Sequence, residues 1–220
     1  MSTPSYVDSS VRSFLVSLSE RSPEPAGGAA LAIAGASAAA LVSLACHTAA
    51  RKAGGDEEQS IVVRECHAGS DELVRRIQGL VDLDVRAYRG VRRALSGPRD
   101  GDPEQQAHYR RELDEALVEA VDIPLQLAEA CLDVLDTATR TAPAVRPPVT
   151  GDLVAAIHLA SAAIKGSLRN ARINASTLDD AAAQHEALTR IDAITARFNR
   201  QRKETASVLA QWAPDYAEDL

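Results

Sequence analysis

Apolar side chains recur at helical spacing along most of the chain. Residues 6–20 predict an amphipathic helix, because five apolar side chains share one of its faces: Val7, Val11, Phe14, Leu15 and Leu18. Residues 26–50 contain no charged side chain and consist mainly of Ala, Gly and Ser. A helix that is apolar on every side is normally buried, so we expect this segment to lie between close neighbours.

Periodicity and start and stop signals predict four further helices. They cover residues 57–95, 103–139, 152–175 and 178–212. Gly69 is a candidate break in the first of them. Asp102 and Pro103 give the second a cap and a proline at its first position, and Pro124 should kink it because proline has no amide hydrogen. Three prolines predict an extended connection over residues 142–149.

The composition agrees with an all-α fold. Hydrophobic residues make up 45% of the 220 residues and aromatic residues only 3%, so most of the apolar content is Ala, Leu, Val and Ile. Alanine is the strongest helix former and fills a sheet core poorly. No segment alternates like a strand. We therefore expect one domain, residues 1–220, built as a bundle of about six mostly long helices.

Charge and cysteine content exclude several classes of protein. A net charge of −7 argues against a nucleic-acid binder, which needs a basic surface. Cys46, Cys66 and Cys131 form no Cys-x-x-Cys pair, and the five histidines are scattered, so we expect no metal site. Unpaired cysteines and the lack of a secretory signal at the N-terminus predict a cytoplasmic protein.

A membrane-spanning helix is the alternative for the uncharged residues 26–50. The segment is long enough to cross a bilayer. Its apolar content is mostly alanine, however, and leucine-class side chains supply most of the insertion energy. We expect no membrane partner.

Several short motifs follow one another in an order typical of one enzyme family. They lie in residues 23–29 (PEPAGGA), 82–88 (DLDVRAY), 121–125 (VDIPL), 151–152 (GD), 165–166 (KG) and 170–174 (NARIN). The ordered set resembles the cyclodeaminase and methenyltetrahydrofolate cyclohydrolase family, which includes the C-terminal domain of formimidoyltransferase-cyclodeaminase. Each motif is weak alone, but together they span most of the chain.

The resemblance implies an all-helical homodimer with its active site in a cleft. The substrate would be a tetrahydrofolate derivative, with no metal. Cyclodeaminases of this kind release ammonia from the formimino derivative as a ring closes, and cyclohydrolases add water to the methenyl cation. The resemblance also makes three further residues candidates for substrate binding: His47, Lys52 and Asn174.

Five positions depart from the family pattern. Alanines replace a glycine and a serine of the Gly-rich loop, larger apolar residues follow the aspartate at 152, and a histidine stands where asparagine is common; the positions are Ala26, Ala29, Leu153, Val154 and His47. By the resemblance, these positions lie near the expected ligand site.

Asp152 is the candidate catalytic residue. A methenyl or formimino carbon carries amidinium-like positive charge, which a carboxylate stabilises, and the same carboxylate can transfer protons. A simple helix cap is the alternative, a role that aspartate often fills. The two roles are compatible.

A cationic stripe is predicted on the helix that follows Asp152. Lys165, Arg169 and Arg172 share one face and suit the glutamate carboxylates of a folate; a solvated surface is the alternative. The prediction requires this stripe and Asp152 to meet in one cleft, within one subunit or across a dimer.

Two further groups are substrate-binding candidates. Gly27 and Gly28 precede a helix and can present backbone N–H groups to a ligand, although a tight turn explains them equally well. Asp84 and Tyr88 lie one turn apart and can line a cleft together; surface pairing of the acidic segment with Arg86 or Arg89 is the alternative.

Three functional hypotheses therefore stand. The first is a folate-dependent cyclodeaminase or cyclohydrolase. The second keeps the scaffold but changes the reaction, because the departures predict a more apolar pocket. The third is a non-enzymatic helical dimer that acts as an interaction protein.

Overall fold

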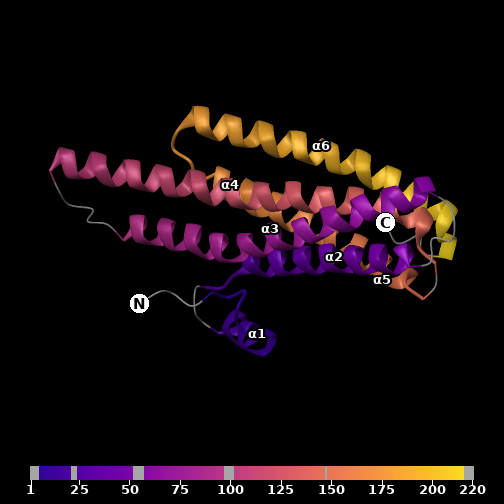
Figure 1. The fold of residues 1–220 in the computed structure, drawn as a ribbon. Coiled ribbons are helices and arrows are strands. Elements are labelled where there is room, and N and C mark those ends of the chain that lie inside the picture. The colour runs from indigo at the N-terminus through magenta and orange to yellow at the C-terminus, as the bar shows by residue number, and fades with distance from the viewer. Residues whose placement is uncertain (1–4, 21–23, 52–56, 97–101, 147, 216–220) are drawn as a thin grey trace.

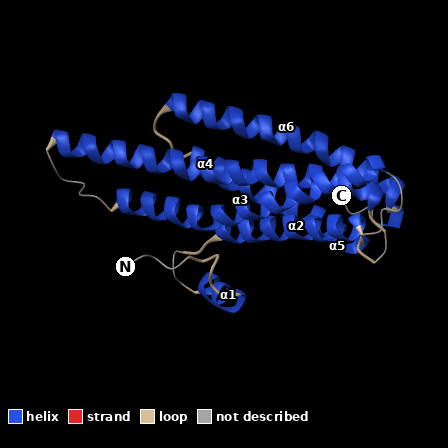
Figure 2. Cartoon of the chain, viewed as in Figure 1, coloured by secondary structure: helices blue, strands red, loops and turns tan. Residues whose placement is uncertain are grey.

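The computed structural model describes residues 5–20, 24–51, 57–96, 102–146 and 148–215. These residues form six α-helices: α1 (Val11–Ser19), α2 (Gly27–Ala50), α3 (Glu57–Leu95), α4 (Pro103–Thr141), α5 (Thr150–Ala175) and α6 (Ala181–Trp212). A short 3₁₀ turn, η1 (Ala142–Ala144), follows α4. No strand occurs in these ranges (Figure 2). The predicted all-α bundle of about six helices is confirmed.

Helices α2 to α5 pack side by side as the core of an elongated bundle, with α6 lying along α4 and α5 (Figure 1). Helix α1 lies beside the N-terminal end of α2, and Phe14 is its one buried residue. Its outer face leaves Val11 77% and Leu15 55% exposed. The amphipathic helix predicted for residues 6–20 is thus present but shorter.

Small side chains allow α2 to approach its neighbours closely. Ala32, Ala38 and Ala45 are fully buried. A Cβ on Gly35 would lie 2.6 Å from the Cys131 Sγ on α4, so this contact depends on glycine. The expectation of an all-small helix squeezed between others is confirmed on the packed side of α2.

By length and composition, α2 is also the one described helix apolar enough to cross a membrane, with a mean hydropathy of 2.0 over its most apolar window. Half of that window is buried inside the protein. The core helix of a globular protein has the same properties.

Three local predictions were wrong. Helix α3 runs unbroken through Gly69, since one glycine inside a long helix costs only about 1 kcal/mol. Residues 142–144 form a 3₁₀ turn instead of extended chain, because a proline fits the start of a helical turn. Helix α5 begins two residues before Asp152, and its N-cap is Val149. Asp152 lies in the first turn and is not the cap.

Candidate active site

A cavity of about 460 Å³ lies at the end of the bundle where α2 begins. Its wall comes from the N-terminal end of α2, the C-terminal parts of α3 and α5, and the middle of α4. Apolar side chains of α3 and α4 form most of it: Val85, Ala87, Val91, Leu95, Leu113, Leu117 and Ile123. A largely apolar pocket with a few polar groups is the usual form of a small-molecule site.

The Asp84 carboxylate caps the start of α2 from the neighbouring helix. The residue at the N-cap position, Ala26, has no side chain that could accept a hydrogen bond. Asp84 accepts one instead from the backbone N–H of Ala29. Gly28 makes this approach possible, because a Cβ there would overlap the Asp84 carboxylate. The lack of a side chain at residue 28 is therefore what lets the Asp84 carboxylate reach the start of α2.

Burial raises the pKa of Asp84 from 3.8 to about 6, and the hydrogen bond from Ala29 opposes this shift. Removing a carboxylate from water disfavours its charged form, whereas a helix N-terminus favours it. The first effect is the larger here. A carboxyl group that titrates near neutral pH can both accept and return a proton.

Of the described residues in the cavity wall, Asp84 and Glu24 alone are charged. Glu24 forms an ion pair through Oε1 with Arg89, five residues beyond Asp84 on α3, while its Oε2 is buried without a hydrogen-bond partner. Arg89 balances the charge of Glu24, so the Asp84 carboxylate supplies the negative charge of the apolar interior, which suits a ligand whose buried part is cationic.

The Asn174 side chain replaces a backbone hydrogen bond that Pro124 removes from α4. Proline has no N–H, so the carbonyl of Ala120, four residues earlier, loses its helical partner. The Asn174 Nδ2 donates to that oxygen at 2.6 Å. Ala120, Pro124 and Asn174 all line the cavity. The hydrogen bond ties α5 to α4 in the wall itself.

Comparison with known proteins assigns the fold to a family. The formiminotransferase-cyclodeaminase family model matches residues 10–193, most of the chain. The chain belongs to this family. It is 33% identical over 187 residues to a methenyltetrahydrofolate cyclohydrolase of Methylorubrum extorquens, covering 84% of this chain and 88% of the relative.

Two further relatives belong to the cyclodeaminase branch. The chain is 28% identical over 200 residues to the formimidoyltransferase-cyclodeaminase of Rattus norvegicus, covering 90% of this chain but only 36% of that longer protein. The crystal structure of formiminotetrahydrofolate cyclodeaminase from Thermotoga maritima superposes with a TM-score of 0.81 at 22% identity, covering 93% of this chain and 97% of that one. This last similarity shows the shared fold.

Five of the residues singled out from the family motifs lie in the cavity wall: Gly27, Gly28, Asp84, Tyr88 and Asn174. They come from three helices and converge at one end of the bundle. The alternative, surface pairing of the acidic segment with Arg86 or Arg89, is not found among the described residues, where Arg89 pairs with Glu24 instead. Lys52 lies outside the described residues.

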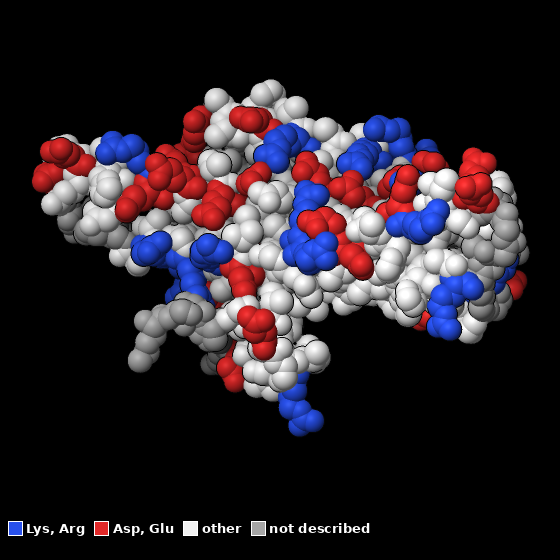
Figure 3. Space-filling model, viewed as in Figure 1, with Lys and Arg blue, Asp and Glu red and all other residues white. Residues whose placement is uncertain are grey.

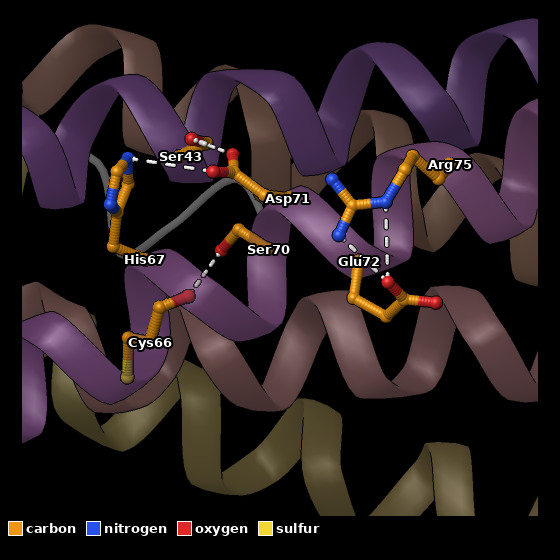
Figure 4. A network of polar contacts seen from close by, with 7 residues as sticks. All are labelled: Ser43, Cys66, His67, Ser70, Asp71, Glu72 and Arg75. Atoms are coloured by element: carbon orange, nitrogen blue, oxygen red, sulfur yellow. Dashed lines mark hydrogen bonds and ion pairs between the residues drawn. The ribbon is translucent and has the colours of Figure 1, made fainter.

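His47 lies far from this cavity. It is exposed in the C-terminal part of α2, about 28 Å along the helix from Gly28. Its ring is 5.8 Å from that of His67 on α3. His67 in turn lies 3.9 Å from Asp71, which accepts a 2.7 Å hydrogen bond from Ser43 (Figure 4). His47 thus belongs to a separate polar cluster on the surface.

The cationic stripe on α5 faces α6 and not the cavity. Arg172 donates a 2.8 Å hydrogen bond to Asp192, and the Lys165 Nζ lies 6.0 Å from the centre of the Phe198 ring. Arg169 is exposed and is absent from the cavity wall. The expectation that these cations line the cleft is wrong for a single chain.

Asp152 and Arg172 are at opposite ends of α5. Twenty residues of one continuous helix separate them by about 30 Å. Asp152 does not line the cavity. A shared cleft within one chain is therefore excluded, and a catalytic role for Asp152 at such a cavity requires a second chain.

Sequence reasoning missed three polar residues of the wall, Glu24, Asn170 and Thr177. Glu24 stands inside the proline motif, and Asn170 opens the segment that ends in Asn174. Asn170 could have been found, since residues four apart share a helix face. No local pattern marks Glu24.

Proposed function

We propose that this chain is a folate one-carbon enzyme acting on 5,10-methenyltetrahydrofolate or 5-formiminotetrahydrofolate. The observation that carries the proposal is a half-buried carboxyl group, Asp84, in an apolar and anionic cavity. Both substrates present an amidinium-like carbon, and a nearby carboxylate stabilises that charge in a low-dielectric site. The names of the relatives describe the same pair of reactions.

In the cyclohydrolase direction, Asp84 acts as a general base. It removes a proton from a water molecule while the water oxygen bonds to the methenyl carbon. The resulting hydroxyl intermediate then collapses: its remaining O–H proton passes to solvent as the formyl C=O forms, the carbon–nitrogen bond breaks, and the carboxyl group returns its own proton to the departing folate nitrogen, so that one proton is released overall. In the cyclodeaminase direction, the second folate nitrogen bonds to the formimino carbon and gives its N–H proton to the carboxylate, and the carboxyl group passes that proton to the formimino nitrogen, which leaves as ammonia when its bond to carbon breaks. A pKa of about 6 suits both steps.

The experiment measures the decay of the ultraviolet absorbance of 5,10-methenyltetrahydrofolate, corrected for the uncatalysed rate at each pH. We expect Asp84→Asn to lower kcat by about 100-fold or more, the usual contribution of a general base. Wild-type kcat/KM should rise as pH increases through about 6, because the base must be ionised. Asp84→Asn should lose that rise.

Asp82→Asn is the matched control. Asp82 lies on the same helix and accepts the Tyr6 N–H at 2.8 Å, which an asparagine oxygen can still do. It should keep wild-type kinetics. No acceleration by wild-type protein with the methenyl or the formimino substrate would reject the proposal, and equal losses in the two variants would reject the role of Asp84.

The departures from the family pattern favour this reading over a changed reaction. Leu153 and Val154 are buried in the core at the far end of α5. Ala29 is fully buried and contributes its N–H to Asp84. Only Ala26 reaches the cavity wall. The substitutions therefore change this pocket less than their number implies.

We further propose that the protein works in the cytoplasm. We also propose that two chains associate through α2. Ser37, Ala40, Leu44 and His47 form an exposed, uncharged stripe along α2. The surface over this helix is mostly free of charged side chains (Figure 3). Small residues allow helices to pack closely, so a second copy fits this face better than a charged partner does.

A further inference from the structure

Two arginines lie next to the cavity wall, near the end of α3 and the start of α4. Asp84, Tyr88 and Arg92 follow at intervals of four residues, so Arg92 lies on the cavity face of α3, one turn beyond Tyr88. On α4, Arg110 precedes Leu113 and Leu117 at intervals of three and four and shares their face. Both arginines are exposed and lie outside the cavity wall itself, within three residues of the wall residues Leu95 and Leu113.

The two helices bring these arginines to the same rim. They run antiparallel where a Cβ on Gly90 would lie 3.7 Å from the Ala116 Cβ. Arg110 therefore lies across from the end of α3, just beyond the apolar pair Leu95 and Leu113. Blue side chains gather over this end of α3 in Figure 3.

Neither arginine has an acidic partner in the described parts of the chain. Arg89, three residues before Arg92, is by contrast held by Glu24. Because Arg92 and Arg110 form no ion pair within the described residues, two cations at one end and the Asp84 carboxylate at the other give the site opposite charge at its two ends. Such a site suits a ligand with a cationic centre at one end and carboxylates at the other.

The spacing fits a folate. Eight residues of helix place Arg92 about 12 Å along α3 from Asp84. This span is comparable to an aminobenzoyl group extended by one glutamate, the part of a folate that follows the one-carbon unit. Leu95, Leu113 and Leu117 line the intervening wall and would contact the aromatic ring.

We propose that Arg92 and Arg110 bind the glutamate carboxylates of the ligand and so select folates over tail-less pterins. The inference rests on the proposed function, since it places the one-carbon unit at Asp84. Arginine binds carboxylates through paired hydrogen bonds, which gives affinity and orientation together. The arginines do not touch the reacting atoms, so they act on binding and not on the chemical step.

The test compares 5-formyltetrahydrofolate with 5-formyltetrahydropteroate, which lacks the glutamate, by calorimetric titration. Wild-type protein should bind the folate about tenfold or more tightly than the pteroate. Arg92→Ala combined with Arg110→Ala should remove this difference by weakening folate binding, leave pteroate affinity unchanged, and raise KM for methenyltetrahydrofolate with little change in kcat.

Arg93→Ala combined with Arg111→Ala is the control. It removes the same charge, but each position is turned by about 100° from its neighbour, away from the cavity face. We expect it to keep the preference for the folate. Wild-type protein that binds both ligands equally would overturn this inference while leaving the proposed function intact. Equal losses in the two double variants would also overturn it, and wild-type protein that binds neither ligand would reject both proposals.

Discussion

Gly27 and Gly28 are adjacent at the start of α2 but have different surroundings. A Cβ on Gly28 would overlap the Asp84 carboxylate, whereas nothing lies within 4 Å of one on Gly27. We expect Gly28→Ala to displace the carboxylate from the Ala29 N–H and to lower the free energy of unfolding by about 1–3 kcal/mol. Urea denaturation measures this change.

Gly27→Ala provides the comparison within the same turn. Alanine at this position meets no neighbour and favours the helix, so the free energy of unfolding should stay the same or rise by up to about 1 kcal/mol. If the two variants unfold at the same urea concentration, Gly28 does not serve the close approach of Asp84.

The same pair shows what the sequence can reveal about single residues. The motif in residues 23–29 predicted glycines at a helix start, and Asp84 with Tyr88 was expected to line a cleft; the structure places all of them in one cavity. The sequence motif could not predict that Asp84 caps α2, because this contact joins residues that are more than fifty positions apart in the chain. The role of Glu24 was hidden for the same reason.

At the scale of helices, the join between α4 and α5 can be tested by a double-mutant cycle. Asn174→Ala should leave the Ala120 carbonyl without a partner and cost about 1–3 kcal/mol of unfolding free energy. In a Pro124→Ala background, the new N–H at residue 124 bonds to Ala120, so the same substitution should cost clearly less. The difference between the two costs, the coupling free energy, should be about 1 kcal/mol.

Chemical denaturation of the four proteins gives this coupling. An equal cost of Asn174→Ala in both backgrounds would show that the asparagine does not replace the missing proline donor. Asn174→Gln tests the geometry, because its longer side chain carries the same amide but places it about one methylene further along.

The positions of the helices along the chain were easier to predict than the way in which the helices pack against each other. Capping by Asp102, whose carboxylate accepts two backbone N–H groups, set the start of α4 as expected. The predicted meeting of Asp152 with Arg172 failed in one chain because both lie on one unbroken helix. The rise per residue alone requires their separation. The motif residues that line the cavity are those at the end of the bundle where α2 begins.

At the scale of the molecule, the fold followed from composition and periodicity, and oligomerisation is the open expectation. Charge is absent from the exposed stripe of α2, while α3, α4 and α6 carry many charged residues on their outer faces. The sequence predicted the small residues of α2 but could not show which of them α3 and α5 leave uncovered.

Ala40→Arg tests the proposed dimer. Ala40 is exposed in the middle of the α2 stripe, and two facing arginines would repel and separate the helices. Analytical ultracentrifugation should show wild-type protein as a dimer and this variant as a folded monomer, with helical circular dichroism unchanged. Ala193→Arg, at an exposed position of α6, should remain dimeric. Monomeric wild-type protein would contradict the proposal.

The Ala40→Arg monomer also tests whether Asp152 acts at the cavity of a second chain. Asp84 and its cavity are complete within one chain, so a folded Ala40→Arg monomer should keep folate binding. If Asp152 serves the cavity of a second chain, Asp152→Ala should lower kcat in the dimer, and the monomer should show that same low kcat with or without Asp152. If Asp152→Ala leaves the dimer fully active, the carboxylate has no catalytic role, and Asp84 alone handles the proton.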